Sequence, residues 1–183
     1  MEWRGVTTTN ILIGNFFFIA GLGMVISAQW ELVRGNSFGY TVMSAFGFFY
    51  AGFGAVLTPS FGVTAAYGTD TVEYNNAMGL YLTMWAVFTF MLLISSLATN
   101  LICIGIFINC EIGFALVAAS YFALADGDPA TATTLKKTGG VFCFLAGMLG
   151  WYTVAHLMCR HPWLFGFPMG DVGRLSARRR RRA

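Results

Sequence analysis

Charged side chains are scarce in this sequence. Asp, Glu, Lys and Arg together make up 10% of the 183 residues, whereas 57% of the residues are hydrophobic. So few charges cannot supply the polar surface that a folded soluble domain needs. The composition therefore excludes an ordinary soluble protein and predicts a membrane protein. The longest polar connection, "DGDPATATTLKK", is only long enough for a loop, so we expect no soluble domain between the apolar segments.

Cysteine and histidine are also few, with four and two residues. The cysteines lie within or at the ends of apolar segments and show no CxxC spacing; they are Cys103, Cys110, Cys143 and Cys159. We therefore expect free thiols and no metal site. The sequence also contains no HExxH sequence, nucleophile elbow or phosphate-binding loop. These absences argue against an enzyme, and we expect no cofactor.

Long apolar runs dominate what is present. A helix needs about 20 mostly apolar residues to cross the hydrocarbon layer of a bilayer. Five windows qualify: residues 11–33, 38–58, 78–98, 101–125 and 138–158. None of them shows the short alternating pattern of a barrel strand, and backbone amides in lipid must be bonded within their own segment. We predict an all-α fold, a polytopic transmembrane helical bundle with five spans.

The predicted organisation is a short N-terminal segment at residues 1–10, a transmembrane helical domain at 11–160 and a basic tail at 161–183. Small residues recur at four-residue spacing within two of the windows, at Gly47, Ala51 and Ala55 and again at Ala146 and Gly150. In lipid no hydrophobic force draws helices together, and such stripes allow their backbones to approach closely. We expect these stripes to be helix-packing surfaces.

Basic residues indicate the orientation of the chain in the membrane. The net charge of +3 depends on the arginine run at residues 178–182. A nucleic-acid patch is one interpretation of this run, but after five spans we expect a solvated cytoplasmic tail that meets anionic lipid. Counting back through the spans places Arg34 inside. The segment 59–76, with Asp70 and Glu73, is then expected to be an outer loop.

One acidic residue lies near the middle of the fourth window. Glu111 stands beside Asn109 in "FINCEIGFA". An acidic side chain at a helix centre costs about 2.5–3.5 kcal/mol on insertion scales, so it should face the bundle interior. Two interpretations stay open. Glu111 is either a carboxylate that binds and releases a proton during a transport cycle, or a permanently protonated, hydrogen-bonded core acid.

A second polar feature, "AQWELVRGNSFGYT", separates the first two apolar windows. Glu31 and Arg34 fall on one helical face, but an exposed pair of this kind contributes only about 0.2–0.5 kcal/mol. Asn36 or Ser37 can cap the next helix, whose amides and positive dipole end favour a carboxylate. An ordinary capped interfacial turn is the alternative. The junction "LATNLI" repeats the arrangement on the same side with Thr99 and Asn100.

These segments resemble a known family. "WELVRGNSFGYTVMSAFGFFYAGFGAVLTPSFG" resembles the second and third helices of the acetate uptake transporter family, the acetate/succinate–proton symporters, with the approximate pattern W-E-x-x-x-G-N-T-F-x-x-T-x-x-x-S-Y-G-x-F-W. "LYLTMWAVFTFMLLISSLATN" is similar to the helix that follows. "GGVFCFLAGMLGWYTVAHLM" with "FPMGDVGRL" is similar to the closing helix and the F-x-L-P-x-G-D-L tail of the fungal branch. The resemblance covers about residues 11–175.

The resemblance implies a six-helix protomer in a ring-shaped homo-oligomer, in which each protomer carries a path for acetate or another small monocarboxylate moving with protons. Narrow hydrophobic rings along that path, one of them built on the aromatic of S-Y-G, would dehydrate the passing acid. The positions carried over from the motif are Glu31, Gly35, Asn36, Ser37, Phe38, Thr41 and, for that aromatic, Phe46. With Thr99 and Asn100 they form our set of candidate substrate-binding residues, and Glu111 is the candidate for proton coupling.

The sequence also departs from the family pattern. No segment of this sequence matches the first helix of the family, with its N-P-A-P-L-G signature. The S-Y-G motif has become "AFG" at residues 45–47, and Ala98 replaces the usual arginine before T-N. Two functions therefore stay open. One is proton-coupled or channel-like transport of acetate or a similar small monocarboxylate across the plasma membrane. The other is a non-conducting truncated paralogue that acts as a structural or regulatory membrane subunit.

Overall fold

The computed structural model describes residues 5–6, 8–159 and 166–172. The arginine run at 178–182, with most of the predicted basic tail, lies outside the described residues. Five helical stretches are long and apolar enough to cross a membrane: Asn10–Val33, Ser37–Leu57, Thr71–Ser96, Leu101–Ala125 and Pro129–Met158. No strand occurs in the described ranges, where the only extended pairing is an isolated bridge between Asn100 and Asp171. The all-α prediction with five spans is confirmed.

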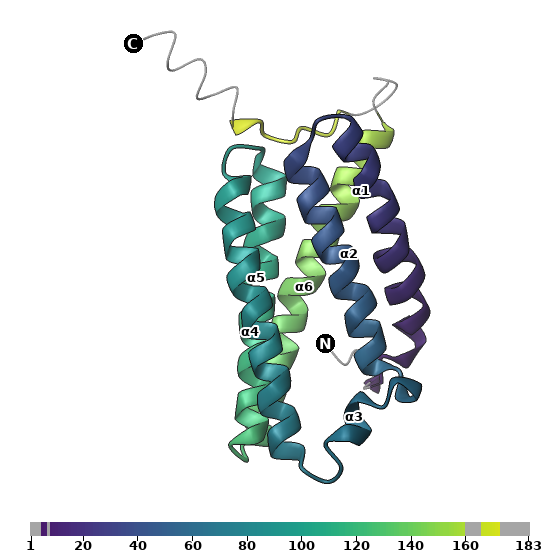
Figure 1. Ribbon diagram of the computed structural model, residues 1–183. Coiled ribbons are helices and arrows are strands. Elements are labelled where there is room, and N and C mark those ends of the chain that lie inside the picture. The colour runs from purple at the N-terminus through teal and green to yellow at the C-terminus, as the bar shows by residue number, and fades with distance from the viewer. Residues whose placement is uncertain (1–4, 7, 160–165, 173–183) are drawn as a thin grey trace. The chain divides into compact units, whose positions relative to one another are not determined.

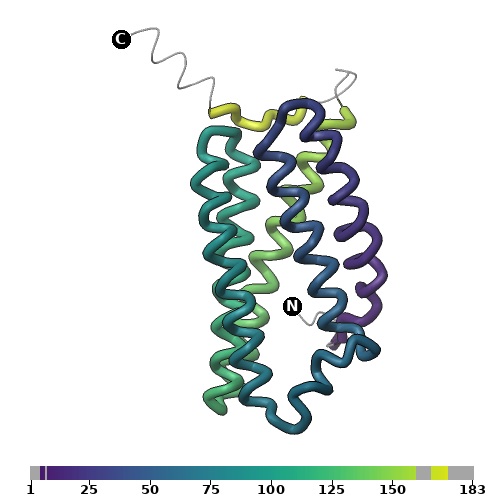
Figure 2. The backbone as a smooth tube through the Cα atoms, in the orientation of Figure 1, coloured from purple at the N-terminus to yellow at the C-terminus, as the bar shows by residue number. Residues whose placement is uncertain are grey.

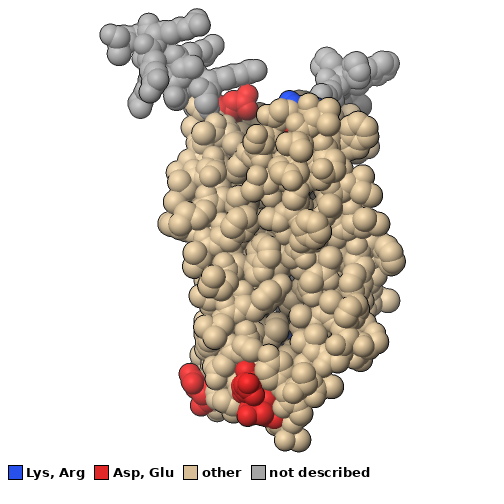
Figure 3. Space-filling view, viewed as in Figure 1, with Lys and Arg blue, Asp and Glu red and all other residues tan. Residues whose placement is uncertain are grey.

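The elements follow one another along the chain as η2 (Asn10–Leu12), η3 (Asn15–Gly23), α1 (Met24–Val33), α2 (Ser37–Leu57), η4 (Pro59–Phe61), α3 (Val63–Ala66), α4 (Thr71–Ser96), α5 (Leu101–Ala125) and α6 (Pro129–Met158) (Figure 1). They form two compact units. We call the part up to Tyr74 the N-terminal unit and the part from Asn75 onward the C-terminal unit, and describe each by itself. In the face shown in Figure 3, acidic side chains gather near the ends and uncharged residues cover most of the length between them.

In the N-terminal unit, η3 and α1 form one continuous stretch that packs along α2 (Figure 2). A Cβ atom on Gly21 would lie 3.1 Å from Ala51 Cβ, and one on Gly47 would lie 2.7 Å from Val25 Cγ2. The predicted packing role of Gly47 and Ala51 is therefore confirmed, because only small residues leave room for this approach.

The apolar pattern of the first span suggested an ordinary α-helix. The structure differs, because η3 is a π-helix of nine residues. A Cβ atom on Gly21 would lie only 2.7 Å from the carbonyl oxygen of Phe16, five residues earlier. This wider turn is thus tolerated where glycine is present. The Phe16 ring stacks on Tyr50 at 5.9 Å and meets Phe53 edge-on at 5.8 Å.

α4 begins at Thr71, seven residues before the apolar window, so the prediction of a loop over the whole of 59–76 is wrong. The segment also contains the short helices η4 and α3. Asp70 explains the early start, because its Oδ1 accepts a hydrogen bond from the Glu73 amide at 2.9 Å. A helix capped in this way can extend beyond the apolar residues that the membrane requires.

α6 likewise begins at Pro129, so most of "DGDPATATTLKK" is helix rather than the predicted loop. Asp128 caps this helix, with its Oδ1 accepting from the Thr131 amide at 3.0 Å. Hydrogen bonds from Thr131 lower the pKa of the Asp128 carboxyl below its usual value. Hydrophobicity marks the part of a helix that suits lipid, whereas a cap and a proline at the first position mark where the helix starts.

In the C-terminal unit, α5 packs along α6, and α4 meets α5 where Gly79 faces Phe122. A Cβ atom on Gly79 would lie 2.6 Å from the Phe122 ring, and one on Gly113 would lie 2.6 Å from Cys143 Sγ. Ala146 is buried, as its packing role requires. Gly150 has no described atom of this chain within 4 Å, so its predicted packing role stays a prediction. The four cysteines are free, as predicted.

Candidate functional site

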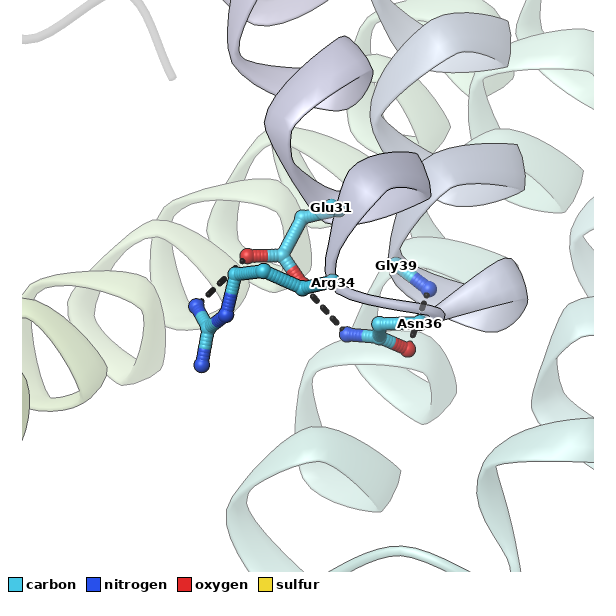
Figure 4. Close-up of polar contacts among 4 residues, drawn as sticks. All are labelled: Glu31, Arg34, Asn36 and Gly39. Atoms are coloured by element: carbon cyan, nitrogen blue, oxygen red, sulfur yellow. Dashed lines mark hydrogen bonds and ion pairs between the residues drawn. The ribbon is translucent and has the colours of Figure 1, made fainter.

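The first group of candidate residues lies where α1 ends and α2 begins (Figure 4). Asn36 Nδ2 donates a hydrogen bond to Glu31 Oε2 at 2.5 Å, and Arg34 Nη1 forms an ion pair with Glu31 Oε1 at 3.1 Å. Asn36 Oδ1 accepts from the Gly39 amide at 3.0 Å and so caps α2. The Glu31 carboxylate thus holds both the arginine and the capping amide in place.

The backbone explains why this sequence forms the turn. The Asn36 amide donates to the Glu31 carbonyl and the Gly35 amide donates to the Leu32 carbonyl, both at 2.9 Å. This Schellman pair ends α1 and needs a left-handed residue, which Gly35 supplies with φ of 74°. A Cβ atom on Gly39 would lie 2.5 Å from Asn36 Nδ2, so a larger residue there would displace the capping side chain. Sequence reasoning missed Gly39, because a family motif shows positions and not the contacts between them.

Exposure and charge distinguish the members of this group. The Arg34 side chain is 68% exposed and that of Glu31 is 22% exposed, so the guanidinium meets solvent while its partner is largely covered. Ser37 and Phe38 form the first turn of α2. The Thr41 hydroxyl donates to the Ser37 carbonyl at 2.9 Å, so it serves its own helix.

Phe46 is placed away from the turn. It lies ten residues beyond Asn36 on α2, which corresponds to about 15 Å along the helix axis. The side chain is buried among aromatic rings, with centroids 6.5 Å from Phe49 and 6.4 Å from Tyr50. The structure therefore joins Glu31 and Asn36 directly and separates Phe46 from them.

The second group opens α5. Asn100 Oδ1 accepts from the Cys103 amide at 2.8 Å, which confirms the predicted cap. The Thr99 hydroxyl donates to the Ser96 carbonyl at 2.6 Å. Residues 166–172, which we call the C-terminal strap, cross this helix start. The Leu101 amide donates to the Gly170 carbonyl at 3.0 Å and the Ile102 amide donates to the Met169 carbonyl at 3.4 Å.

The C-terminal strap is also held on its other side. Tyr152 Oη, on α6, donates to the Pro168 carbonyl at 2.9 Å, and His156 Nδ1 lies 2.6 Å from the Phe167 carbonyl. The Tyr152 and Phe167 rings meet edge-on at 5.5 Å. The first amides of α5, expected to be open to a carboxylate, are therefore bonded to protein carbonyls. The tail motif "FPMGDVGRL" was visible in the sequence, but nothing in it indicated this contact.

Glu111 is half-buried on α5, and its Oε2 atom is buried with no hydrogen-bond partner in the described structure. Its neighbour Asn109 donates instead to the Gly105 carbonyl at 2.8 Å. A fully hydrogen-bonded core acid is thus the weaker of the two interpretations for this side chain. Glu111, Thr99 and Asn100 belong to the C-terminal unit, whereas Glu31, Asn36 and the other candidates belong to the N-terminal unit.

Comparisons with known proteins cover almost the whole chain. The chain is 49% identical over 181 residues to the acetate transporter protein patA of Aspergillus clavatus, covering 99% of this chain and 73% of that protein. It is 47% identical over 182 residues to patA of Penicillium expansum, covering 100% of this chain and 73% of that protein.

A solved structure has the same fold. The bacterial acetate channel SatP matches with a TM-score of 0.69 and 23% identity, over 91% of this chain and 86% of that one. The model of the GPR1/FUN34/yaaH family matches residues 1–169. The family resemblance drawn from the sequence is confirmed. This chain therefore belongs to the GPR1/FUN34/yaaH family.

Proposed function

We propose that this chain is an integral membrane protein that transports acetate or a similar small monocarboxylate. The observation that carries the proposal is the 49% identity, over 99% of this chain, to a protein named as an acetate transporter. Five helices of membrane-spanning length and apolar composition support it. Transport is proton-coupled or channel-like, the C-terminus faces the cytoplasm, and the membrane is the plasma membrane.

The start of α2 is our candidate for the first contact with the anion. The exposed Arg34 guanidinium and the positive end of α2 attract a carboxylate, and the Asn36 cap fixes that helix end. Glu31 offsets the charge of Arg34. The resulting attraction for the anion is weak. Weak binding suits a transport path, because a solute must leave each site as readily as it enters.

We assign two further steps of transport, dehydration of the acid and carriage of the proton, to Phe46 and Glu111. A buried aromatic residue such as Phe46 offers a passing acid no hydrogen bonds, so it favours the dehydrated, neutral form. Glu111 supplies a carboxyl group that can carry the accompanying proton. We further propose that the chain assembles with copies of itself into a ring surrounded by lipid, as the family resemblance implies.

Uptake of radiolabelled acetate by vesicles containing the purified chain tests the proposal. We expect uptake that increases when the outside is made acidic, since protons then move inward with acetate. Vesicles without protein are the control. No uptake at any pH would contradict transport and favour a non-conducting membrane subunit.

The role of Glu111 is tested in the same vesicles. Glu111→Gln keeps the size of the side chain and removes its ionisable proton. We expect acetate uptake by this variant to depend less on pH than uptake by the unmodified chain. An unchanged pH profile would exclude Glu111 from the proton path.

A further inference from the structure

Thr89 on α4, like Ser44 on α2, has a buried hydroxyl oxygen with no hydrogen-bond partner among the described residues. Helical hydroxyls in a membrane usually donate to a carbonyl of their own helix. Thr83, Ser96, Ser120 and Thr153 all do so here. Thr89 is 0% exposed, yet its Oγ1 atom has no hydrogen-bond partner in the part of the chain that the structure describes. A buried polar group without a partner costs about 1–3 kcal/mol, so a ligand that bonds this hydroxyl would stabilise the folded chain.

A second unpartnered oxygen lies at the same level of the C-terminal unit. A Cβ atom on Gly79 would lie 2.6 Å from the Phe122 ring, and we take this contact as the register between α4 and α5, which run in opposite directions (Figure 1). Thr89 lies ten residues after Gly79, and Glu111 lies eleven residues before Phe122. At about 1.5 Å per residue these steps are about 15 and 16.5 Å, so the two residues share one depth.

Helical phase brings both residues toward the packed side of their helices. Eleven residues are close to three full turns, so Glu111 lies on the same face of α5 as Phe122, which meets α4. Thr89 continues the buried stripe of α4, whose members before it are Met78, Gly79, Leu82 and Ala86. Glu111 is also the only charged residue between Glu73 and Asp126 in the sequence. A carboxyl group at this depth therefore has no cation of these two helices to pair with.

We propose that the Thr89 hydroxyl and the Glu111 carboxyl form a station that holds the carboxyl group of the transported acid within the C-terminal unit. The proposal rests on the transport function proposed above. Thr89 Oγ1 donates a hydrogen bond to one oxygen of the acid. Glu111 and the acid share one proton through the other oxygen, so the pair needs no cation. The acid thereby supplies partners for Thr89 Oγ1 and Glu111 Oε2, which have none among the described residues.

Thr89→Val is the decisive variant, because valine has the shape of threonine and lacks its hydroxyl. We expect acetate uptake to fall by roughly tenfold, the change that corresponds to one lost hydrogen bond to a charged group. Thermal stability should stay equal or rise, since an unpartnered buried hydroxyl is removed. Thr89→Ser should restore most of the uptake. Thr83→Val is the matched control on α4, since its hydroxyl donates to the Gly79 carbonyl at 2.8 Å; its uptake should stay unchanged.

Uptake by Thr89→Val equal to that of the unmodified chain would overturn the station. An equal fall in Thr83→Val would also overturn it, because the effect would then belong to helix packing. If the unmodified chain takes up no acetate, the transport proposal fails and the station is tested by binding. Titration of the detergent-solubilised chain with ¹³C-acetate should then show weaker binding to Thr89→Val than to Thr83→Val, and equal binding would reject the station.

Discussion

The starts of α2 and α5 carry the same cap and differ in what surrounds it. In both, an asparagine side chain accepts a hydrogen bond from the amide three residues later, Gly39 at 3.0 Å and Cys103 at 2.8 Å. At α2 the cap is held by a neighbouring side chain, Glu31. At α5 the C-terminal strap bonds the preceding amides of the first turn. An Asn cap alone therefore does not say whether a helix start is open to an anion.

Charge increases the contrast. The α2 start carries the Glu31–Arg34 pair, which leaves an exposed guanidinium near the positive helix end. At the α5 start, Asp171 of the strap stands opposite Asn100 in an antiparallel bridge. An acidic residue near a helix N-terminus stabilises the helix and repels a second anion. For a carboxylate, α2 is thus the more accessible of the two helix starts.

The largest effect is expected from Gly170→Ala, which breaks the arrangement at α5. Gly170 has φ of 70°, and a Cβ atom there would lie 2.8 Å from Leu101 Cδ1. The left-handed backbone alone costs an alanine about 1–2 kcal/mol, so we expect the strap to detach. The free energy of unfolding in detergent should fall by about that amount, and hydrogen exchange of the Leu101 and Ile102 amides should become faster.

Gly166→Ala is the control for this variant, because a Cβ atom at Gly166 would have no described atom within 4 Å. Its unfolding and its amide exchange should match those of the unmodified chain. The Gly39 amide at the α2 start should keep its exchange rate in both variants. Unchanged protection of Leu101 and Ile102 in Gly170→Ala would show that the strap does not hold the start of α5.

A smaller effect should separate the two caps directly. Asn36→Ala and Asn100→Ala each remove one side-chain cap, and each should lower stability by about 1 kcal/mol. Acetate uptake in vesicles, scaled to the amount of folded protein, should fall further for Asn36→Ala, since the start of α5 is already occupied by the strap. Equal scaled uptake in the two variants would make both turns merely structural.

The contrast also shows what could be predicted from the sequence. The apolar windows located all five spans, because lipid selects for long uncharged runs. They missed the true starts of α4 and α6, which Asp70 and Asp128 determine beyond the apolar region. Local sequence narrowed the α2 cap to Asn36 or Ser37 and placed Asn100 at the start of α5, since a cap involves residues only three apart.

Contacts between distant residues were out of reach. The strap meets α5 through backbone groups of residues about seventy positions apart, and backbone hydrogen bonds leave no side-chain pattern to read. The unpartnered Thr89 hydroxyl was missed for a related reason. Its sequence neighbours resemble those of Thr83, and only the packed structure shows that one hydroxyl is bonded and the other is not.

The smallest effect concerns the charge beside α2. Glu31→Gln removes the attraction for Arg34 and keeps an oxygen that can accept from Asn36, so stability should change by only about 0.2–1 kcal/mol. With Arg34 no longer offset, acetate uptake at low salt should reach half-maximum at a lower acetate concentration. Arg34→Gln should shift that concentration upward. Both shifts should shrink in high salt, because the screening length falls to about 3 Å at 1 M. Shifts in the same direction for the two variants would mean that charge at this turn does not attract the anion, and α2 would lose its distinction from α5.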